Sequence, residues 1–335
     1  MLDYQAYTIA AGRTEPGARE RRRPHLHSNQ TTSDSNVLNW KAMPHPLPKK
    51  HKPSAHSDNR RRKKFDRKKL DRKLAEEMAF CDAKGPFDVI GDVHGCLHEL
   101  LELMAALGYE VNWKSGDFAV TPPKHRKLAF AGDLANRGPA TPDVLRLVMK
   151  MVRAGQAYCV PGNQDVKLAR ALRSRARGRV VPGVMRSLEQ FAGEPAEFRA
   201  EVAKFLDGLA SHYVLDDGNL VIAHAGLQER MHGSGSAKAR KFALSGQNNG
   251  KLDKFGSPVR VNWAASYRGD ALVVYGHTPV IEPVWLNNTV NIDTGCVYGG
   301  HLTALRYPER EIVSVPAKAI YSESRRRFPA NSALA

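Results

Sequence analysis

Cysteines, long apolar runs and acidic residues are all scarce in this sequence. No stretch approaches the ~20 consecutive apolar residues of a membrane-spanning helix. No apolar run follows the first charged residues either, so a secretory signal is not expected. The four cysteines are far apart and form no CxxC pair, a usage that argues against a disulfide framework and is typical of a reduced, cytoplasmic protein. The phosphate-loop pattern GxxxxGK(S/T) is absent, which excludes a P-loop kinase module.

The few acidic residues leave the chain strongly basic. Its 335 residues include 51 Lys and Arg against 34 Asp and Glu, which gives a net charge of +17 and a pI near 9.8. Such a charge favours polyanionic partners, namely nucleic acid, anionic lipid or phosphorylated substrates. Hydrophobic residues make up 42% of the chain, so a wholly disordered protein is excluded and one large domain or two smaller ones are possible.

Most of the basic excess lies near the N-terminus. Residues 1–80 hold 19 basic and 9 acidic residues, and residues 60–73 alone hold 10 basic residues in 14. The stretch shows little periodicity, so we expect residues 1–84 to form a disordered basic extension. It could contact RNA, or it could be a solvated segment with no dedicated partner, which is the commoner use of such runs.

From residue 85 onward the apolar pattern alternates between strand and helix, as in an α/β protein. The predicted strands are 86–90, 127–132 and 157–162, and the predicted helices are 97–107, 141–153 and one beginning at 166. This alternation indicates parallel strands joined by right-handed crossovers. Residues 173–210 have a charged helical pattern and are expected to form a small helical cap over one end of the sheet.

The second half of the chain has more strands and fewer helices. The predicted strands lie within 219–226, 271–277, 289–295, 301–307 and 311–316. Few helices separate the last three, so a mixed or antiparallel sheet is expected. Residues 229–258 are rich in Gly, Ser and Lys and are predicted to form a long surface loop or lid, and residues 318–335 a flexible tail.

Polar residues gather where five of these strands end. The five loops are GDVHG at 91–95, GDLANRG at 132–138, GNQD at 162–165, AHAG at 223–226 and GHTP at 276–279. Ligands bind at the carboxyl ends of strands in open α/β sheets. Carboxylates, an amide oxygen and imidazoles together suit borderline divalent metals such as Mn, Fe, Ni or Zn. Six such ligands are too many for one open catalytic ion and suit two ions that share a carboxylate.

One alternative treats each motif separately. A lone Gly-Asp is usually a turn, and a lone His is more often a hydrogen-bonded core residue than a ligand. Five such loops in fixed order, each directly after an apolar strand, are hard to attribute to chance.

This set of loops resembles the signature of the calcineurin-like metallophosphoesterases of the phosphoprotein-phosphatase type. The segments FDVIGDVHGCLHELLELMAALGY and ALVVYGHTP resemble most the branch that contains diadenosine tetraphosphatase-like enzymes and the phosphatase module of bacterial polynucleotide kinase-phosphatase. The resemblance implies a metallophosphoesterase domain over residues 85–317, built as a β-sandwich of mixed parallel and antiparallel sheets flanked by helices.

The resemblance also implies a role for each motif residue. Asp92 and His94 would hold a first metal ion, Asp133 would bridge two ions, and the second ion would be held by Asn163, His224 and His277. Mn²⁺ is the expected metal, with Fe, Ni, Zn or Mg as alternatives. A hydroxide bridging the two ions would attack phosphorus in line. Arg137, helped by the Asn163 amide, would bind the phosphate oxygens.

Two positions depart from the family pattern, GDxxDRG followed by GNH(D/E). The sequence has Asn136 in place of the Asp and Gln164 in place of the His, which in the family is the expected general acid. Gln cannot donate a proton and remain a stable base, although Asn136 and Gln164 could still hydrogen-bond side chain to side chain. Loss of a general acid costs roughly 10²–10⁴-fold in rate. We therefore expect slow turnover of ordinary monoesters and relatively better turnover of activated ones.

Three functional hypotheses follow from the sequence. The first is a metal-dependent phosphoesterase that acts on a nucleotide polyphosphate, an RNA end or a phosphoprotein. The second is a pseudophosphatase that binds metal and phosphate without efficient turnover, and the third is a basic RNA-binding protein. No membrane partner is expected in any of them.

Overall fold

The computed structural model describes residues 81–114, 117–174, 182–254, 256 and 258–324. The chain divides into two units, 1–54 and 55–335, and every described residue lies in the second. The predicted basic extension and the run at 60–73 therefore lie outside the described residues, apart from 81–84. Within the described residues, no helix combines the length and the apolar character needed to cross a membrane.

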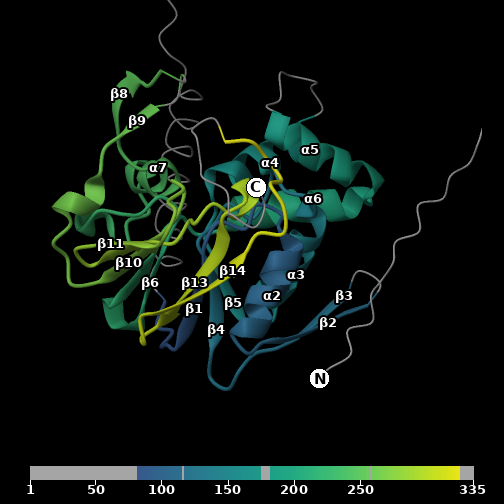
Figure 1. The fold of residues 1–335 in the computed structure, drawn as a ribbon, viewed down its shortest axis with the longest axis horizontal. Helices are drawn as coiled ribbons and strands as arrows, with labels where there is room; N and C mark the ends of the chain where they lie inside the picture. The colour runs from purple at the N-terminus through teal and green to yellow at the C-terminus, as the bar shows by residue number, and fades with distance from the viewer. Residues whose placement is uncertain (1–80, 115–116, 175–181, 255, 257, 325–335) are drawn as a thin grey trace, which may run out of the picture. The chain divides into compact units, whose positions relative to one another are not determined.

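The first of two five-stranded sheets is mixed and has the order β14-β13-β1-β4-β5 (Figure 1). Its strands are β1 (Phe87–Ile90), β4 (Lys127–Phe130), β5 (Ala157–Cys159), β13 (His301–Tyr307) and β14 (Glu311–Pro316). The strands β1, β4 and β5 run parallel, while β13 is antiparallel to both β1 and β14. The parallel crossovers predicted from the strand–helix alternation are confirmed.

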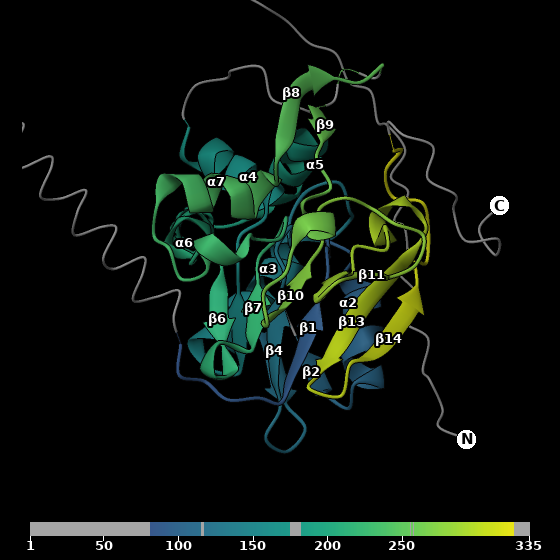
Figure 2. The ribbon, with the colours of Figure 1, turned by 90° about the vertical axis from the view of Figure 1, so that its left-hand side faces the viewer.

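The second sheet is also mixed and has the order β11-β12-β10-β7-β6 (Figure 2). Its strands are β6 (Tyr213–Leu215), β7 (Leu220–Ile222), β10 (Leu272–Tyr275), β11 (Val284–Leu286) and β12 (Thr289–Asn291). The strand β10 is parallel to β7 and β12, and the edge strands β6 and β11 are antiparallel to their neighbours. The prediction of mixed sheets is thus confirmed for both.

The two sheets pack face to face through an apolar layer. Alternate residues of a strand point to opposite faces, so Phe87 and Val89 of β1 enter this layer while Ile90 faces the helices. The second sheet contributes Ile222, Val274 and others of the same cluster, all fully or almost fully buried. The β-sandwich expected from the family resemblance is therefore present.

Helices cover the outer face of the first sheet. They are α2 (Leu97–Ala106) and α3 (Thr141–Arg153), whose apolar residues recur at three- and four-residue spacing and pack into the same cluster as Ile90 (Figure 1). A hairpin of β2 (Glu110–Lys114) and β3 (Asp117–Thr121) lies beside them and was not predicted. Its buried anchor is Phe118, which stacks on Trp113 at 5.3 Å.

Two helices, α5 (Pro182–Gln190) and α6 (Ala196–Gly208), lie in the segment predicted to form the cap, and the preceding helix α4 (Asn163–Arg173) packs with them. Leu168 of α4 and Leu206 of α6 belong to one buried cluster. The helix α4 begins three residues earlier than predicted because Asp165 accepts a hydrogen bond from the backbone of Gly162 at 2.8 Å and so caps its first turn. The short 3-10 helices of the structure are Phe191–Gly193, Asp216–Gly218, Glu229–Met231, Trp263–Ser266 and Cys296–Tyr298.

The prediction of one long loop or lid over 229–258 is wrong. The segment contains the helix α7 (Ala237–Ser245) and the strand β8 (Asn248–Leu252), which pairs with β9 (Pro258–Arg260) (Figure 2). The Ser236 side chain caps α7 by accepting a hydrogen bond from Ala239 at 3.2 Å. Phe242, buried against Trp263, fixes the helix on the outer face of the second sheet.

Candidate active site

The five motif loops meet at one edge of the sandwich. The loops after β1, β4 and β5 come from the first sheet, and those after β7 and β10 come from the second. Of the six predicted metal ligands, Asp92, His94, Asp133 and His224 are almost completely buried, and Asn163 and His277 are half-buried. The structure therefore brings together residues that are 185 positions apart in the sequence. The backbone N–H of His277 donates a hydrogen bond to Asp92 Oδ1 at 3.1 Å.

One group of possible ligands consists of Asp92, His94 and Asp133. The Nε2 atom of His94 lies 3.8 Å from Asp92 Oδ2 and 3.6 Å from Asp133 Oδ2. One ligand atom from each of the three residues lies within 4.8 Å of the others. Two carboxylates and one imidazole around a common point suit a divalent cation.

A second group shares Asp133 with the first and adds His224 and His277. The Nε2 atom of His224 lies 3.5 Å from Asp133 Oδ1 and 2.9 Å from His277 Nδ1. The side-chain amide of Asn163 lies 3.0 Å from the same His277 nitrogen. The two groups contain five residues, with Asp133 common to both, and Asn163 completes the six that the family resemblance implied.

Backbone carbonyls orient two of the imidazoles. The Nδ1 atom of His94 donates to the Ala135 carbonyl at 3.0 Å, and that of His224 donates to the Ala131 carbonyl at 3.1 Å. In each ring the proton is therefore on Nδ1, and the lone pair of Nε2 points toward the carboxylates. This is the usual arrangement of a histidine that binds metal through Nε2.

The contacts among the histidines test whether these residues fit a metal. Burial lowers the pKa of His94 to about 3 and also lowers the pKa values of His224 and His277, so these rings are neutral. His224 Nε2 lies 2.9 Å from His277 Nδ1, a contact that is a hydrogen bond only when the proton of His277 is on Nδ1, and His277 Nε2 is buried with no hydrogen-bond partner. A cation between the two rings would satisfy the facing nitrogens, so the donor set fits the metals that the family resemblance implies.

Burial opposes the ionisation of several carboxyl groups at the site. Burial, together with the nearby Asp293 and Asp133, raises the pKa of Asp92 well above its usual range. Burial also raises the pKa of Asp293 to about 7 and, together with Asp133, that of Asp165 to about 7. Buried acids this close together cannot all ionise without a compensating charge, which is a further reason why divalent cations fit here.

Strained backbone holds several of these side chains in place. Five of the residues have positive φ angles, a region that L-residues other than Gly seldom adopt. They are His94 (48°), Asp133 (48°), Asn136 (72°), Arg137 (74°) and His277 (73°). The loops also approach each other so closely that a Cβ at Gly276 would collide with Asp92 Oδ1. Clustered strain of this kind is typical of functional sites.

Arg137 is the cationic side chain of the site that the sequence predicted. Its Nη1 atom lies 2.7 Å from His94 Nε2, the nitrogen that faces the carboxylates, and its guanidinium lies 5.5 Å from the centre of the Tyr298 ring. A guanidinium fork at this position can reach the oxygens of a phosphate beside the first ligand group.

The side-chain contact that Asn136 and Gln164 could have made is absent. Asn136 Nδ2 instead donates to the backbone oxygen of Gln164 at 2.8 Å. The Gln164 amide contacts Asn163 at 2.7 Å, and with its oxygen turned outward it accepts from Lys167 Nζ at 3.0 Å and Arg137 Nη2 at 3.3 Å. The reason is that Gln164 lies in the first turn of α4, which directs its side chain along the helix toward Lys167.

Sequence reasoning did not select Asp293 or Asp165 as site residues. Asp293 is 4% exposed and follows β12, so the strand-then-loop rule that found the other motifs could also have found the IDTG segment. Asp165 is fully buried and bonds the backbone N–H groups of Ala135 and Gly162 at 3.0 and 2.8 Å. It therefore joins the second and third motif loops.

Comparison with known proteins identifies the family. The model of the calcineurin-like phosphoesterases matches residues 85–281. The chain is 48% identical over 239 residues to the asymmetrical bis(5'-nucleosyl)-tetraphosphatase PrpE of Anoxybacillus flavithermus, across 70% of this chain and 96% of that protein. It is 45% identical over 248 residues to PrpE of Halalkalibacterium halodurans, across 72% and 99%.

A solved structure gives the same result. A crystal structure described as a candidate diadenosine tetraphosphatase superposes with a TM-score of 0.51 and 26% identity, across 71% of this chain and 97% of that one. The motifs, the fold and the relatives all indicate the same family. The chain belongs to the calcineurin-like phosphoesterase family and is a metal-dependent phosphoesterase.

Proposed function

We propose that this protein hydrolyses dinucleoside polyphosphates, with diadenosine tetraphosphate as the representative substrate. The observation that carries the proposal is the pair of ligand groups that share Asp133, with Arg137 beside one of them. The PrpE relatives, named as bis(5'-nucleosyl)-tetraphosphatases, support this substrate class.

The proposed roles follow from the geometry. Asp92, His94 and Asp133 would hold one divalent cation, and Asp133, Asn163, His224 and His277 the other. When bound, two such cations activate water and neutralise phosphate charge. Arg137 would bind non-bridging phosphate oxygens. The side-chain amide of Asn163 would be turned so that its oxygen, and not its nitrogen, lies beside His277 Nδ1. Its nitrogen would then bind a phosphate oxygen.

The departures at Asn136 and Gln164 favour an anhydride substrate. A nucleotide leaving through a phosphate oxygen scarcely needs a proton, whereas the alkoxide of ribose or serine does. Neither Gln164 nor Asn136 can supply that proton, and the nearest cations to Gln164 are Lys167 and Arg137. We therefore expect phosphoanhydrides to be cleaved faster than an RNA 3′-phosphate or a phosphopeptide.

A substrate panel with the full-length chain tests the proposal. Diadenosine tetraphosphate, an RNA 3′-phosphate, a 2′,3′-cyclic phosphate and a phosphoserine peptide would be assayed with Mn²⁺, and then with Fe²⁺, Ni²⁺, Zn²⁺ and Mg²⁺. We expect the highest kcat/KM for the tetraphosphate with Mn²⁺ and a loss of turnover with chelator. Asp133→Asn should lose at least about 100-fold in kcat/KM, because it alters both ligand groups.

Two results would contradict the proposal, and a third would add RNA binding to it. A higher kcat/KM for the phosphopeptide or the RNA end would replace the proposed substrate class. Tight nucleotide binding without metal-stimulated hydrolysis would indicate the pseudophosphatase. The third result is that the full-length protein binds RNA with a steep salt dependence and that deletion of residues 1–84 removes this binding but leaves hydrolysis unchanged. That result would support RNA contact through the basic extension.

A further inference from the structure

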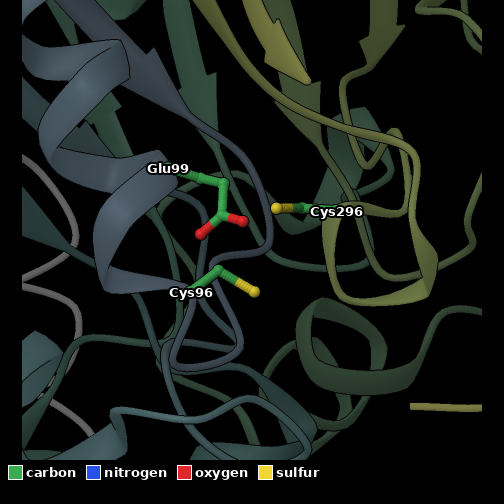
Figure 3. A group of neighbouring side chains, drawn as sticks. All are labelled: Cys96, Glu99 and Cys296. Atoms are coloured by element: carbon green, nitrogen blue, oxygen red, sulfur yellow. The ribbon is translucent and has the colours of Figure 1, made fainter. Parts of the chain in front are cut away.

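A second cluster of metal-ligating side chains lies apart from the motif histidines. It consists of Cys96, Glu99 and Cys296, whose sulfur and carboxylate atoms all lie within 4.8 Å of one another. Cys96 directly precedes α2, Glu99 lies in the first turn of that helix, and Cys296 begins the 3-10 helix Cys296–Tyr298. Figure 3 shows the Cys296 thiol directed toward the Glu99 carboxylate, with the Cys96 side chain beside it.

The carboxylate of Glu99 carries the evidence for a ligand. Glu99 is fully buried, and its Oε1 atom accepts hydrogen bonds from the backbone N–H of Lys318 and the hydroxyl of Tyr321, each at 2.8 Å. Its Oε2 atom is also buried but has no hydrogen-bond partner. An unpaired buried carboxylate oxygen is costly, and buried charges are normally paired or bound to a metal.

The other possible metal ligands beside this carboxylate are two sulfur atoms. Cys96 is fully buried and Cys296 is 1% exposed, and both thiols are free. Two sulfurs and one carboxylate oxygen are ligands of a thiophilic divalent cation such as Zn²⁺, and they do not suit Mg²⁺ or Ca²⁺. Around tetrahedral zinc the two sulfurs would be ~3.8 Å apart, which requires at most a small closure of the cluster.

We propose that Cys96, Glu99 and Cys296 form a third metal site, which binds a thiophilic divalent cation and has a structural role. On binding, the two thiols release two protons, so two thiolates and one carboxylate face one divalent cation and leave a net charge of −1. The two hydrogen bonds to Glu99 Oε1 stabilise that remaining charge. This proposal does not depend on which substrate the enzyme hydrolyses.

The position of the cluster explains what such a cation would do. Cys96 lies two residues after His94, and Cys296 lies three residues after Asp293, so the site joins the backs of two loops that face the candidate active site. The segment 317–322 closes the same region, because Tyr321 and Ser322 bond the Val297 carbonyl at 3.1 and 3.0 Å. A bound cation would therefore hold the start of α2, the Cys296 loop and residues 318–321 together.

Cobalt substitution of the full-length protein gives a specific test. The protein would be stripped with chelator, kept reduced with a phosphine, and titrated with Co²⁺. The candidate active site offers only nitrogen and oxygen ligands, so a sulfur-to-cobalt charge-transfer band can arise only where thiolates bind. We expect this band in the wild type, its loss on addition of one further equivalent of Zn²⁺, and three metal ions per chain by elemental analysis.

Matched variants assign the band. The double variant Cys96→Ser with Cys296→Ser should lose the band and bind two ions per chain, and Glu99→Gln should weaken cobalt binding at least tenfold. Cys159→Ser alters a thiol that is equally buried but outside the cluster and should behave as the wild type.

The absence of the band in folded wild-type protein would overturn the proposal even if a variant failed to fold. Persistence of the band in the double variant, or fewer than four titratable thiols in freshly purified denatured protein (a disulfide), would also overturn it.

Discussion

The side-chain nitrogen of Asn136 donates to the backbone oxygen of Gln164 at 2.8 Å, while the side-chain oxygen of Asn136 is buried with no partner. The amide pair is therefore joined by one main-chain contact and does not reproduce the charged Asp–His interaction of the family pattern. An Asp at 136 would place a carboxylate where the unpaired oxygen now lies. The two positions are close enough to be coupled.

We predict that restoring both residues increases turnover of poor leaving groups. Gln164→His with Asn136→Asp should raise kcat/KM for an alkyl phosphate by roughly 10²-fold or more, because a general acid then protonates the leaving oxygen. The gain for p-nitrophenyl phosphate should be much smaller. Both esters would be assayed with Mn²⁺, with Gln164→Ala as control. An equal gain on the two esters, or no gain on the alkyl ester, would show that proton donation is not what limits this enzyme.

The planar guanidinium of Arg137 should contribute to catalysis through its two-oxygen binding geometry as well as through its charge. Arg137→Ala is expected to lower kcat/KM for diadenosine tetraphosphate by about 10²–10³-fold, because a donor to the developing phosphate charge is lost. Arg137→Lys should recover only a small part, since an ammonium group cannot bind two oxygens in one plane. Arg153→Ala, at an exposed arginine of α3 paired with Glu201, serves as the control and should be unchanged. Full activity in Arg137→Lys would contradict the bidentate role.

A buried ion pair joins β1 to the residue before β4 and should contribute to stability. Asp88 is fully buried, Arg126 is 8% exposed, and the two are joined at 2.8 Å, with Tyr109 donating to the same carboxylate at 3.0 Å. We expect Asp88→Asn to reduce the unfolding free energy by about 1–3 kcal/mol, because the Arg126 guanidinium then keeps only Glu309, at 2.9 Å, as a carboxylate partner. Urea denaturation would measure this. Asp117→Asn, which breaks the exposed pair with Lys150, should cost less than about 1 kcal/mol.

His212 should make stability depend on pH. Burial, with His232 nearby, lowers its pKa to about 4, and its Nε2 atom accepts from the Gly233 backbone at 2.8 Å. The unfolded chain takes up this proton near the ordinary pKa of 6.5, so between these values the unfolded state binds more protons and stability falls as pH falls. The loss should reach up to about 3 kcal/mol near pH 4.

Substitution isolates that contribution. His212→Gln retains an acceptor for Gly233 but cannot titrate, so its unfolding free energy should fall less between pH 7 and pH 4.5 than that of the wild type. The exposed His98 provides the matched control, and His98→Gln should follow the wild-type slope. Parallel curves for wild type and His212→Gln would show that His212 is not protonated on unfolding.

The meeting of the five loops was predicted because each motif directly follows an apolar strand, whereas the sandwich was implied only by the family resemblance. Parallel strands place their carboxyl ends at one edge, which explains why the loops of each sheet gather. The meeting of Asp92 and His277 requires in addition that the two sheets pack face to face. Asp293 follows the same rule but lacks a histidine neighbour, and the signal was not used. How the side chains of Asn136 and Gln164 pair could not be predicted, because it depends on where α4 begins.

Composition concealed other elements. The residues around Ala237–Ser245 look like a polar loop, since Lys and Arg flank the few apolar side chains that pack on Trp263. The hairpin at β2 and β3 has charged, polar or small residues at its outward positions, and only Phe118 is deeply buried in it. In both cases tertiary contacts of one aromatic residue stabilise an element that local pattern alone does not favour.

The supply of ligands from both sheets has a consequence for the protein's lifetime. Asp92, His94 and Asp133 follow strands of one sheet, and His224 and His277 follow strands of the other. An ion held by both would act as a cross-link that exists only in the folded state. Mass action then makes resistance to unfolding rise with free metal concentration. Metal starvation would therefore shorten the survival of this enzyme as well as slow its reaction.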